Sequence, residues 1–282
     1  MSMSDNDPEG SRAIEEQEQE EHDGLTFEVV EDEHDEGGRK VRSKGIYLLP
    51  NLATTAALCS GFYSIVSAIN ADFVVAAEWI FLAAIFDGMD GRLARRFNAQ
   101  SAFGAEYDSL SDLVSFGVAP ALLIYLWSLQ YLGKHGWFIA FIHTACAAFR
   151  LARFNVQMGV VDKRFFIGLS SPLGAAVIAS MVWAGVEYDV PHKNILLVLP
   201  IAIATVANAL LMVSNFKFYS FKELDRSRVP FAVMLPIVLV LGIVLYDLPV
   251  GLLSVSLVYA ASGPVAALWN RRRKASTPLK TA

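Results

Sequence analysis

Four aspartates in the stretch "DGMDGRLARRFNAQSAFGAEYDSLSD" (87–112) are the residues of this chain best suited to chemistry. Asp87 and Asp90 are three residues apart and Asp108 and Asp112 four apart, so each pair lies on one face of a helix. Hard divalent cations such as Mg²⁺ prefer oxygen ligands and are usually held by a few carboxylates together with substrate phosphates. Metals bridged by shared acids can clamp the attacking and leaving oxygens of a displacement at phosphorus. The spacing therefore predicts a divalent-metal site for phosphoryl chemistry.

Small residues and an arginine accompany these acids. Gly91 continues the Asp87 face, Arg95 follows one turn later, and Gly104 precedes Asp108 by one turn. Bare backbone leaves room for a ligand, and a guanidinium group grips phosphate. The simpler alternative is a set of interfacial ion pairs between the acids and neighbouring arginines. Four acids at paired helical spacing favour the ligand site.

The elements that must position the acids are membrane helices. The chain has 282 residues, 54% of them hydrophobic, and a mean hydropathy of +0.42. Its apolar runs reach about 18 to 25 residues, the length that a bilayer-spanning helix needs. Acids at membrane depth are costly and are therefore functional candidates. We expect an all-α, polytopic membrane protein with eight transmembrane helices, at 46–69, 72–93, 109–131, 137–158, 170–187, 194–213, 230–246 and 251–269.

Charge divides the chain into three parts. Fifteen of the 28 acidic residues fall between Asp5 and Glu36, whereas residues 39–282 hold 22 Lys and Arg against 13 Asp and Glu. We expect an acidic disordered tail (1–38), a catalytic membrane domain (39–270) and a basic tail (271–282), because the first segment has too little apolar surface to fold. The cationic loops alternate with short polar turns, so the positive-inside rule places both termini and the acids in the cytoplasm. In a bacterial cell this membrane would be the inner one.

Two function classes find little support in the composition. Cys59 and Cys146 both lie in apolar runs, where a thiol serves as a small hydrophobe, so neither a disulfide framework nor a zinc site is expected. The cluster "RRRK" at 271–274 follows a final span and is interpreted as a topology anchor rather than a nucleic-acid site.

The acidic stretch also resembles a known family. Its spacing, Asp-x2-Asp-Gly-x2-Ala-Arg-x8-Gly-x3-Asp-x3-Asp from 87 to 112, matches the signature of the CDP-alcohol phosphatidyltransferases at every fixed position. The resemblance implies an integral membrane enzyme with a six-helix core, which transfers a substituted phosphoryl group from a CDP-linked donor to an alcohol and releases CMP. It also implies a divalent metal cofactor, Mg²⁺ or Mn²⁺, with two ions bound. The resemblance further implies that the protein is a homodimer and that membrane lipids surround it.

Residue roles follow from the same resemblance. Asp87, Asp90 and Asp108 correspond to metal ligands, and Asp112 to a ligand that is also the proposed catalytic base. Gly91, Arg95 and Gly104 correspond to positions that accommodate the CDP-diacylglycerol nucleotide. "PNLATT" at 50–55 resembles a segment that places Asn51 and Thr54 near the nucleotide, although an Asn beside a Pro is also an ordinary helix-start signal.

Other segments favour a serine acceptor. The stretches at 47–65, 149–157, 165–172 and 210–222 resemble those of membrane-embedded phosphatidylserine synthases, with one departure: Gly168-Leu-Ser-Ser-Pro172 stands where Gly-Leu-Pro-Ser-Pro is expected. The implied substrates are CDP-diacylglycerol and L-serine. Serine carries a carboxylate, so its pocket needs a cation. Arg150 and Arg153 are candidates for binding serine or phosphate, with the loop cations Lys163, Arg164, Lys217 and Lys222 as further ones; snorkelling is the alternative for the arginines.

Several alternatives remain at this level. A sibling enzyme that uses glycerol 3-phosphate, inositol phosphate or choline differs only in its acceptor pocket. A membrane prenyltransferase would carry its acids on two distant helix pairs, and a cation transporter would bury them near the midplane. A covalent route needs a His-x-Lys motif, and none of the five histidines begins one. His143, the histidine within a span, is interpreted as a packing or hydrogen-bonded residue.

Overall fold

The structure is a computed structural model that describes residues 33–34, 40–41, 48–96, 102–157, 165–219, 241–242 and 244–275. The chain divides into two compact units, Met1–Gly45 and Ile46–Ala282. In the first, the described residues form an antiparallel pair of two-residue strands, β1 (Glu33–His34) and β2 (Lys40–Val41). Apart from Glu33 and His34, the tail expected to be disordered (1–38) lies outside the described residues, so that expectation stays a prediction.

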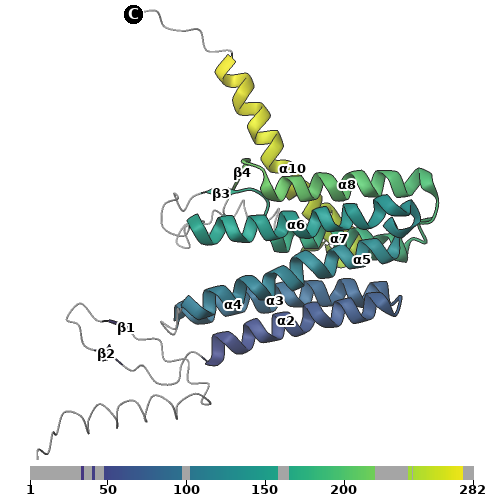
Figure 1. Ribbon diagram of the computed structural model, residues 1–282. Coiled ribbons are helices and arrows are strands. Elements are labelled where there is room, and N and C mark those ends of the chain that lie inside the picture. The colour runs from purple at the N-terminus through teal and green to yellow at the C-terminus, as the bar shows by residue number, and fades with distance from the viewer. Residues whose placement is uncertain are drawn as a thin grey trace, which may run out of the picture. The chain divides into compact units, whose positions relative to one another are not determined.

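The second unit is built of helices (Figure 1). In chain order they are α2 (Leu48–Ile69), α3 (Phe73–Arg96), α4 (Ala102–Asp112), α5 (Ala119–Trp127), α6 (Lys134–Gln157), α7 (Ser171–Glu187), α8 (Ile195–Val213) and α10 (Leu248–Ala275). A π-helical segment, η1 (Leu113–Val118), joins α4 to α5, and a 3₁₀ turn, η2 (Leu129–Leu132), follows α5. The prediction of an all-α membrane protein is confirmed.

Among the described residues, five stretches of helix are long and apolar enough to cross a membrane. They are Asn51–Ile69, Phe103–Trp127, Lys134–Val156, Ile195–Val213 and Leu248–Ala267. Two other predicted spans are helical but differ in kind: α3 carries Glu78, Asp87 and Asp90 among its apolar residues, and α7 has only 17 residues. The predicted span at 230–246 lies largely outside the described residues, so the count of eight stays a prediction.

The residues before α7 and after α8 form a small sheet that the sequence did not predict. Strand β3 (Phe165–Ile167) pairs antiparallel with β4 (Lys217–Tyr219). Gly168, which follows β3, has φ +81°, and a Cβ there would lie 3.1 Å from the Ser214 carbonyl oxygen, so this corner favours glycine. The sheet therefore ties the start of α7 to the end of α8.

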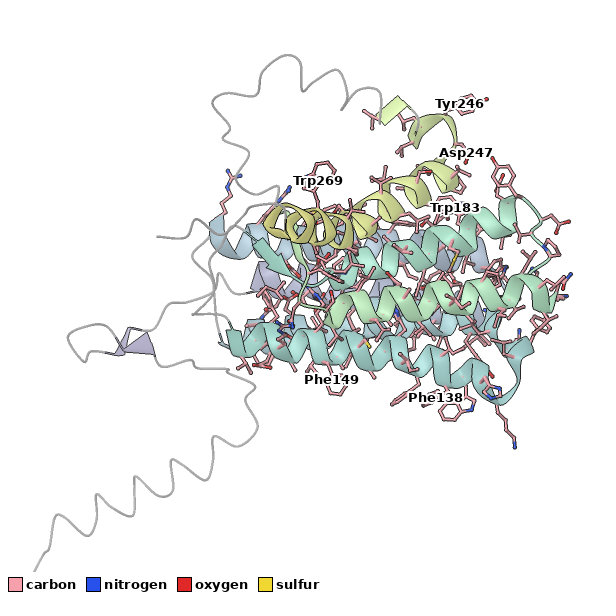
Figure 2. All side chains as sticks on the ribbon, turned by 90° about the horizontal axis from the view of Figure 1, so that it is seen from above. Phe138, Phe149, Trp183, Tyr246, Asp247 and Trp269 are labelled. Atoms are coloured by element: carbon pink, nitrogen blue, oxygen red, sulfur yellow. The ribbon has the colours of Figure 1, made fainter. Side chains whose placement is uncertain are left out.

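The core of the second unit is built around η1 and α5. Phe116, Leu123, Ile124 and Trp127 are fully or almost fully buried there, against residues of α3 and α7. The outer faces are apolar in contrast. Figure 2 shows the rings of α6 pointing away from the bundle, among them Phe149, which is 67% exposed. Rings placed in this way suit contact with lipid.

Candidate metal and active site

The acids meet because α3 ends where α4 begins. Asp87 and Asp90 lie in the last turns of α3, and Asp108 lies in the second turn of α4. One carboxylate oxygen from each of these three residues lies within 4.8 Å of the others. The predicted convergence of the two acid pairs is therefore present in the fold. Asp90 is only 6% exposed, so part of this charge is held away from water.

Asp112 completes the group from one turn further along α4. Its carboxyl group is in hydrogen-bonding contact with that of Asp87. Asp108 in turn experiences the charges of both Asp87 and Asp90. Neighbouring acids of this kind repel one another unless protons or cations intervene. All four therefore belong to one electrostatic unit, which we name the acid cluster (Asp87, Asp90, Asp108 and Asp112).

The start of α2 supports the acid cluster through hydroxyl groups. Buried Thr54 donates a hydrogen bond from Oγ1 to Asp90 Oδ2 at 3.0 Å. Ser111, also buried, donates from α4 to the Thr54 carbonyl oxygen at 3.1 Å. Thr54 was expected near the nucleotide, and here its hydroxyl contacts a cluster acid directly. The two bonds fix α2, α3 and α4 to one another at the site.

A cation reaches the acid cluster from α6. Arg150 interacts electrostatically with Asp112 and Asp87. Its Nη1 donates a hydrogen bond to Ser171 Oγ in the first turn of α7, and its Nε is buried without a hydrogen-bond partner. Ser171 thus holds the guanidinium group beside the acids. This role of Ser171 was not predicted, although it lies in the "GLSSP" segment that was singled out.

Serine replaces the expected proline in that segment, but the backbone there still has dihedral angles that proline could adopt. Ser170, in the position where the resemblance leads one to expect proline, has φ −67° and ψ 146°. Proline fixes φ near this value, at about −65°. The loop entry therefore keeps the conformation that a proline would impose.

Arg153 lies elsewhere. Its guanidinium group donates to Asn215 Oδ1 at 2.8 Å and to the Val213 carbonyl oxygen at 3.4 Å. Val213 is the last residue of α8 and Asn215 lies two residues beyond it, so Arg153 caps that helix end. The structure thus separates two arginines that the sequence left equivalent. Of these two arginines, Arg150 is the one that interacts with Asp87 and Asp112 of the acid cluster.

The remaining predicted residues lie along the same helix ends. Asn51 precedes Thr54 by less than one turn, and its carbonyl oxygen accepts a bond from Thr55 Oγ1 at 2.7 Å. Gly91 and Gly104 are half-buried, next to Asp90 and one turn before Asp108. Side chains of the predicted cations Arg95, Lys163, Arg164, Lys217 and Lys222 lie outside the part that the structure describes.

Further polar contacts, which the sequence did not predict, surround the site. Tyr107, next to Asp108, has its hydroxyl 2.9 Å from Thr55 Oγ1. Ser109 and Asn155 exchange hydrogen bonds, with Asn155 Nδ2 donating at 3.0 Å. Their signal is faint, since a hydroxyl next to a cluster acid cannot be told from a surface residue until the neighbouring helix is known.

The donor set suits a hard divalent cation. The three converging oxygens are all carboxylates, and Asp108 Oδ1 is buried without a hydrogen-bond donor. Buried carboxylate oxygens normally have a partner, so this atom has an unused acceptor that a cation would satisfy. Asp87, Asp90 and Asp108 can therefore hold a divalent metal, and Asp112 stands next to them.

Comparison with known proteins agrees with this chemistry. Residues 47–216 match the family model described as CDP-alcohol phosphatidyltransferase. Three similar proteins carry the name CDP-diacylglycerol–serine O-phosphatidyltransferase. They come from Helicobacter pylori strain 26695 (35% identity, 63% of this chain and 74% of the relative), Bacillus subtilis strain 168 (33%, 62% and 92%) and Mycobacterium tuberculosis strain H37Rv (36%, 50% and 51%).

Proposed function

Because this chain belongs to the CDP-alcohol phosphatidyltransferase family, we propose that it transfers the phosphatidyl group of CDP-diacylglycerol to the hydroxyl of L-serine, giving phosphatidylserine and CMP. The observation that carries the proposal is the convergence of Asp87, Asp90 and Asp108 beside Asp112 at one end of the bundle. The similarity to relatives named for this reaction supports serine as the acceptor.

The chemistry is a direct displacement at phosphorus. The serine oxygen attacks the lipid-side phosphorus, the bond from that phosphorus to the bridging oxygen breaks, and CMP leaves with the electron pair. Asp112 accepts the serine hydroxyl proton as the new bond forms. Divalent metal held by Asp87, Asp90 and Asp108 would neutralise charge on the diphosphate. By the family resemblance the metal would be Mg²⁺ or Mn²⁺, with two ions bound.

Residues around the acid cluster then bind and orient the substrates. Asn51, Gly91, Arg95 and Gly104 would line the nucleotide side of the site, where small residues leave space. Arg150 would contact the serine carboxylate or a donor phosphate, because the bond to Ser171 holds its guanidinium beside the acids.

We place the reaction at the cytoplasmic face. The acid cluster lies at the ends of helices whose adjoining connections and termini carry most of the Lys and Arg, which the positive-inside rule assigns to the cytoplasm. The acyl chains would stay in the lipid beside the exposed apolar helix faces. A homodimer is part of the same proposal, and molar-mass measurement in detergent would test it.

The decisive experiment measures CMP release by the purified protein. CDP-diacylglycerol and Mg²⁺ or Mn²⁺ are supplied with L-serine, glycerol 3-phosphate, inositol phosphate or choline in separate reactions. Of the four alcohols, we expect only L-serine to give CMP, together with phosphatidylserine. Release of CMP with another alcohol only would assign a sibling reaction, and metal-dependent cation flux into liposomes without any CMP would assign a transporter.

Two arginine variants test the acceptor side. We expect Arg150→Ala to raise the KM for serine or for CDP-diacylglycerol at least about tenfold, since a charge-assisted bond contributes roughly 1.5–3 kcal/mol. Arg153→Ala is the matched variant on the same helix and should change either KM less than about threefold, because its described contacts hold a helix end. Equal effects of the two changes would contradict the assignment of Arg150.

A further inference from the structure

The helix that carries two cluster acids contains a wide turn directly after them. Segment η1 begins at Leu113, the residue that follows Asp112, and the N–H of Ala119 donates to the Val114 carbonyl oxygen five residues earlier. Such π-helical turns are rare and occur often at functional sites. The segment separates the polar, acid-bearing part of this helix from α5, whose side chains form the apolar core.

Helix α6 supplies hydrogen-bond donors to this wide turn. His143 is fully buried, and its Nε2 lies 3.4 Å from the Phe116 carbonyl oxygen. Thr144 donates from Oγ1 to the Gly117 carbonyl oxygen at 3.2 Å. Because a carbonyl only accepts, Nε2 carries the proton, which leaves Nδ1 as a buried acceptor without a partner. An apolar residue would fill this space without burying an unpaired nitrogen, so we attribute a specific role to the hydrogen bond between the histidine and η1.

Helix α2 contacts the wide turn from the other side. Ser115 is buried and donates from Oγ to the Ala57 carbonyl oxygen at 3.1 Å. Gly61 makes room for this contact, because a Cβ there would lie 2.6 Å from Ser115 Cα. Gly117 packs on Ala147 of α6 with less overlap, since an added Cβ would lie 3.2 Å from the Ala147 Cβ. The segment is thus held from both sides by polar bonds and close contacts.

The wide turn sets the direction in which the acids point. A π-turn accommodates one extra residue, and one residue of an α-helix corresponds to a rotation of about 100°. If η1 became regular α-helix while α5 stayed in the core, Asp108 and Asp112 would rotate by that amount. At a Cα radius of about 2.3 Å this moves each Cα by roughly 3.5 Å. The three converging oxygens lie within 4.8 Å of one another, so such a movement would break up the acid cluster.

We propose that His143 and Thr144 are positioning residues, which hold the wide turn at η1 and thereby aim Asp108 and Asp112 at Asp87 and Asp90. The inference rests on the proposed function for its consequence in catalysis. Its direct effect is on the geometry of the acid cluster and so on the affinity for a divalent cation.

The experiment compares isosteric variants by their direct binding of Mn²⁺, measured by electron paramagnetic resonance of the free ion with full-length protein in detergent. Thr144→Val removes the hydroxyl and keeps the shape, whereas Thr144→Ser keeps the hydroxyl. Thr205→Val is the matched control, since Thr205 is buried in α8 and its hydroxyl bonds only within its own helix, to the Ile201 carbonyl oxygen at 2.8 Å. His143→Leu and His143→Gln form a second pair, without and with a donor.

We expect Thr144→Val and His143→Leu to weaken Mn²⁺ binding about tenfold, as supporting residues of metal sites commonly do. Thr144→Ser and His143→Gln should recover at least half of that loss on a logarithmic scale, and Thr205→Val should bind as the wild type does. Unchanged Mn²⁺ affinity in Thr144→Val, or equal weakening in Thr205→Val, would overturn the inference. If His143→Leu does not fold, the threonine set decides. The binding measurement needs no turnover, so a wild type that binds Mn²⁺ but releases no CMP with serine would refute the proposed function alone.

Discussion

Because the acids of the cluster lie close together, we predict that Asp108→Asn is more stable than the wild type in the absence of metal but is inactive when metal is present. Asp108→Asn removes one negative charge and keeps the shape of the side chain. At the 4.8 Å limit of the converging oxygens, two unit charges repel by about 3.5 kcal/mol at an effective dielectric constant of about 20. Water and shared protons relieve part of this, so we expect about 1–2 kcal/mol of stabilisation in the metal-free variant. The new amide can also donate to a neighbouring carboxylate.

Metal should act in the opposite direction. A cation that binds only the folded wild type at a hundredfold excess over its Kd stabilises it by about 2.7 kcal/mol, and the variant has lost one ligand for it. We therefore expect Asp108→Asn to melt about 2–8 °C higher than the wild type in EDTA, because about 1 kcal/mol corresponds to 2–4 °C at this size. It should gain little on addition of Mg²⁺ or Mn²⁺ and release CMP about a hundredfold to a thousandfold more slowly.

The assay is thermal unfolding in detergent, followed by tryptophan fluorescence with and without metal, together with CMP release. Glu106→Gln is the matched control, since Glu106 lies on the same helix two residues away and is exposed. It should keep the wild-type response to metal. A lower metal-free melting temperature in Asp108→Asn, combined with an undiminished metal response, would refute the reasoning that the acids form one electrostatic unit.

Further predictions concern the support of the acid cluster. Thr54→Val should lower stability by about 1–3 kcal/mol, because it removes the hydrogen bond from Thr54 Oγ1 to buried Asp90, and Thr54→Ser should restore it in the same melting assay. Gly61→Ala should cost at least about 1–3 kcal/mol through overlap with Ser115. Gly88→Ala, where an added Cβ meets nothing within 4 Å, should be neutral or stabilising by up to about 1 kcal/mol, as helix propensity predicts. EDTA should abolish CMP release, and Mg²⁺ or Mn²⁺ should restore it.

The convergence of the acids was predictable because it depends on local periodicity. Spacings of three and four residues place each acid pair on one helix face whatever the rest of the fold does, and a short connection brings the two pairs together. The apolar runs likewise predicted helices within a few residues of their observed bounds. The third span starts earlier than predicted, at Ala102 and not near 109, because its first turns are too polar to register as an apolar run. The last helix also extends further than predicted, to Ala275 and not 269.

What the sequence left open depends on contacts between helices. Arg150 and Arg153 are three residues apart on one helix and chemically identical, yet one interacts with Asp87 and Asp112 while the other caps the end of α8. Only the packing of α6 against α7 and α8 separates them. The same reason hid Ser171, whose hydroxyl acquires its role from the arginine opposite.

The wide turn at η1 shows why positioning is harder to predict than chemistry. Nothing in "LVSFGV" departs from ordinary helix-forming composition enough to indicate a π-helix, because the signal lies in the partners, which are His143 and Thr144 on one side and Gly61 on the other. These residues come from helices far apart in the sequence. A site can therefore be identified from its ligands alone, whereas the residues that aim those ligands emerge only when neighbouring helices are placed around them.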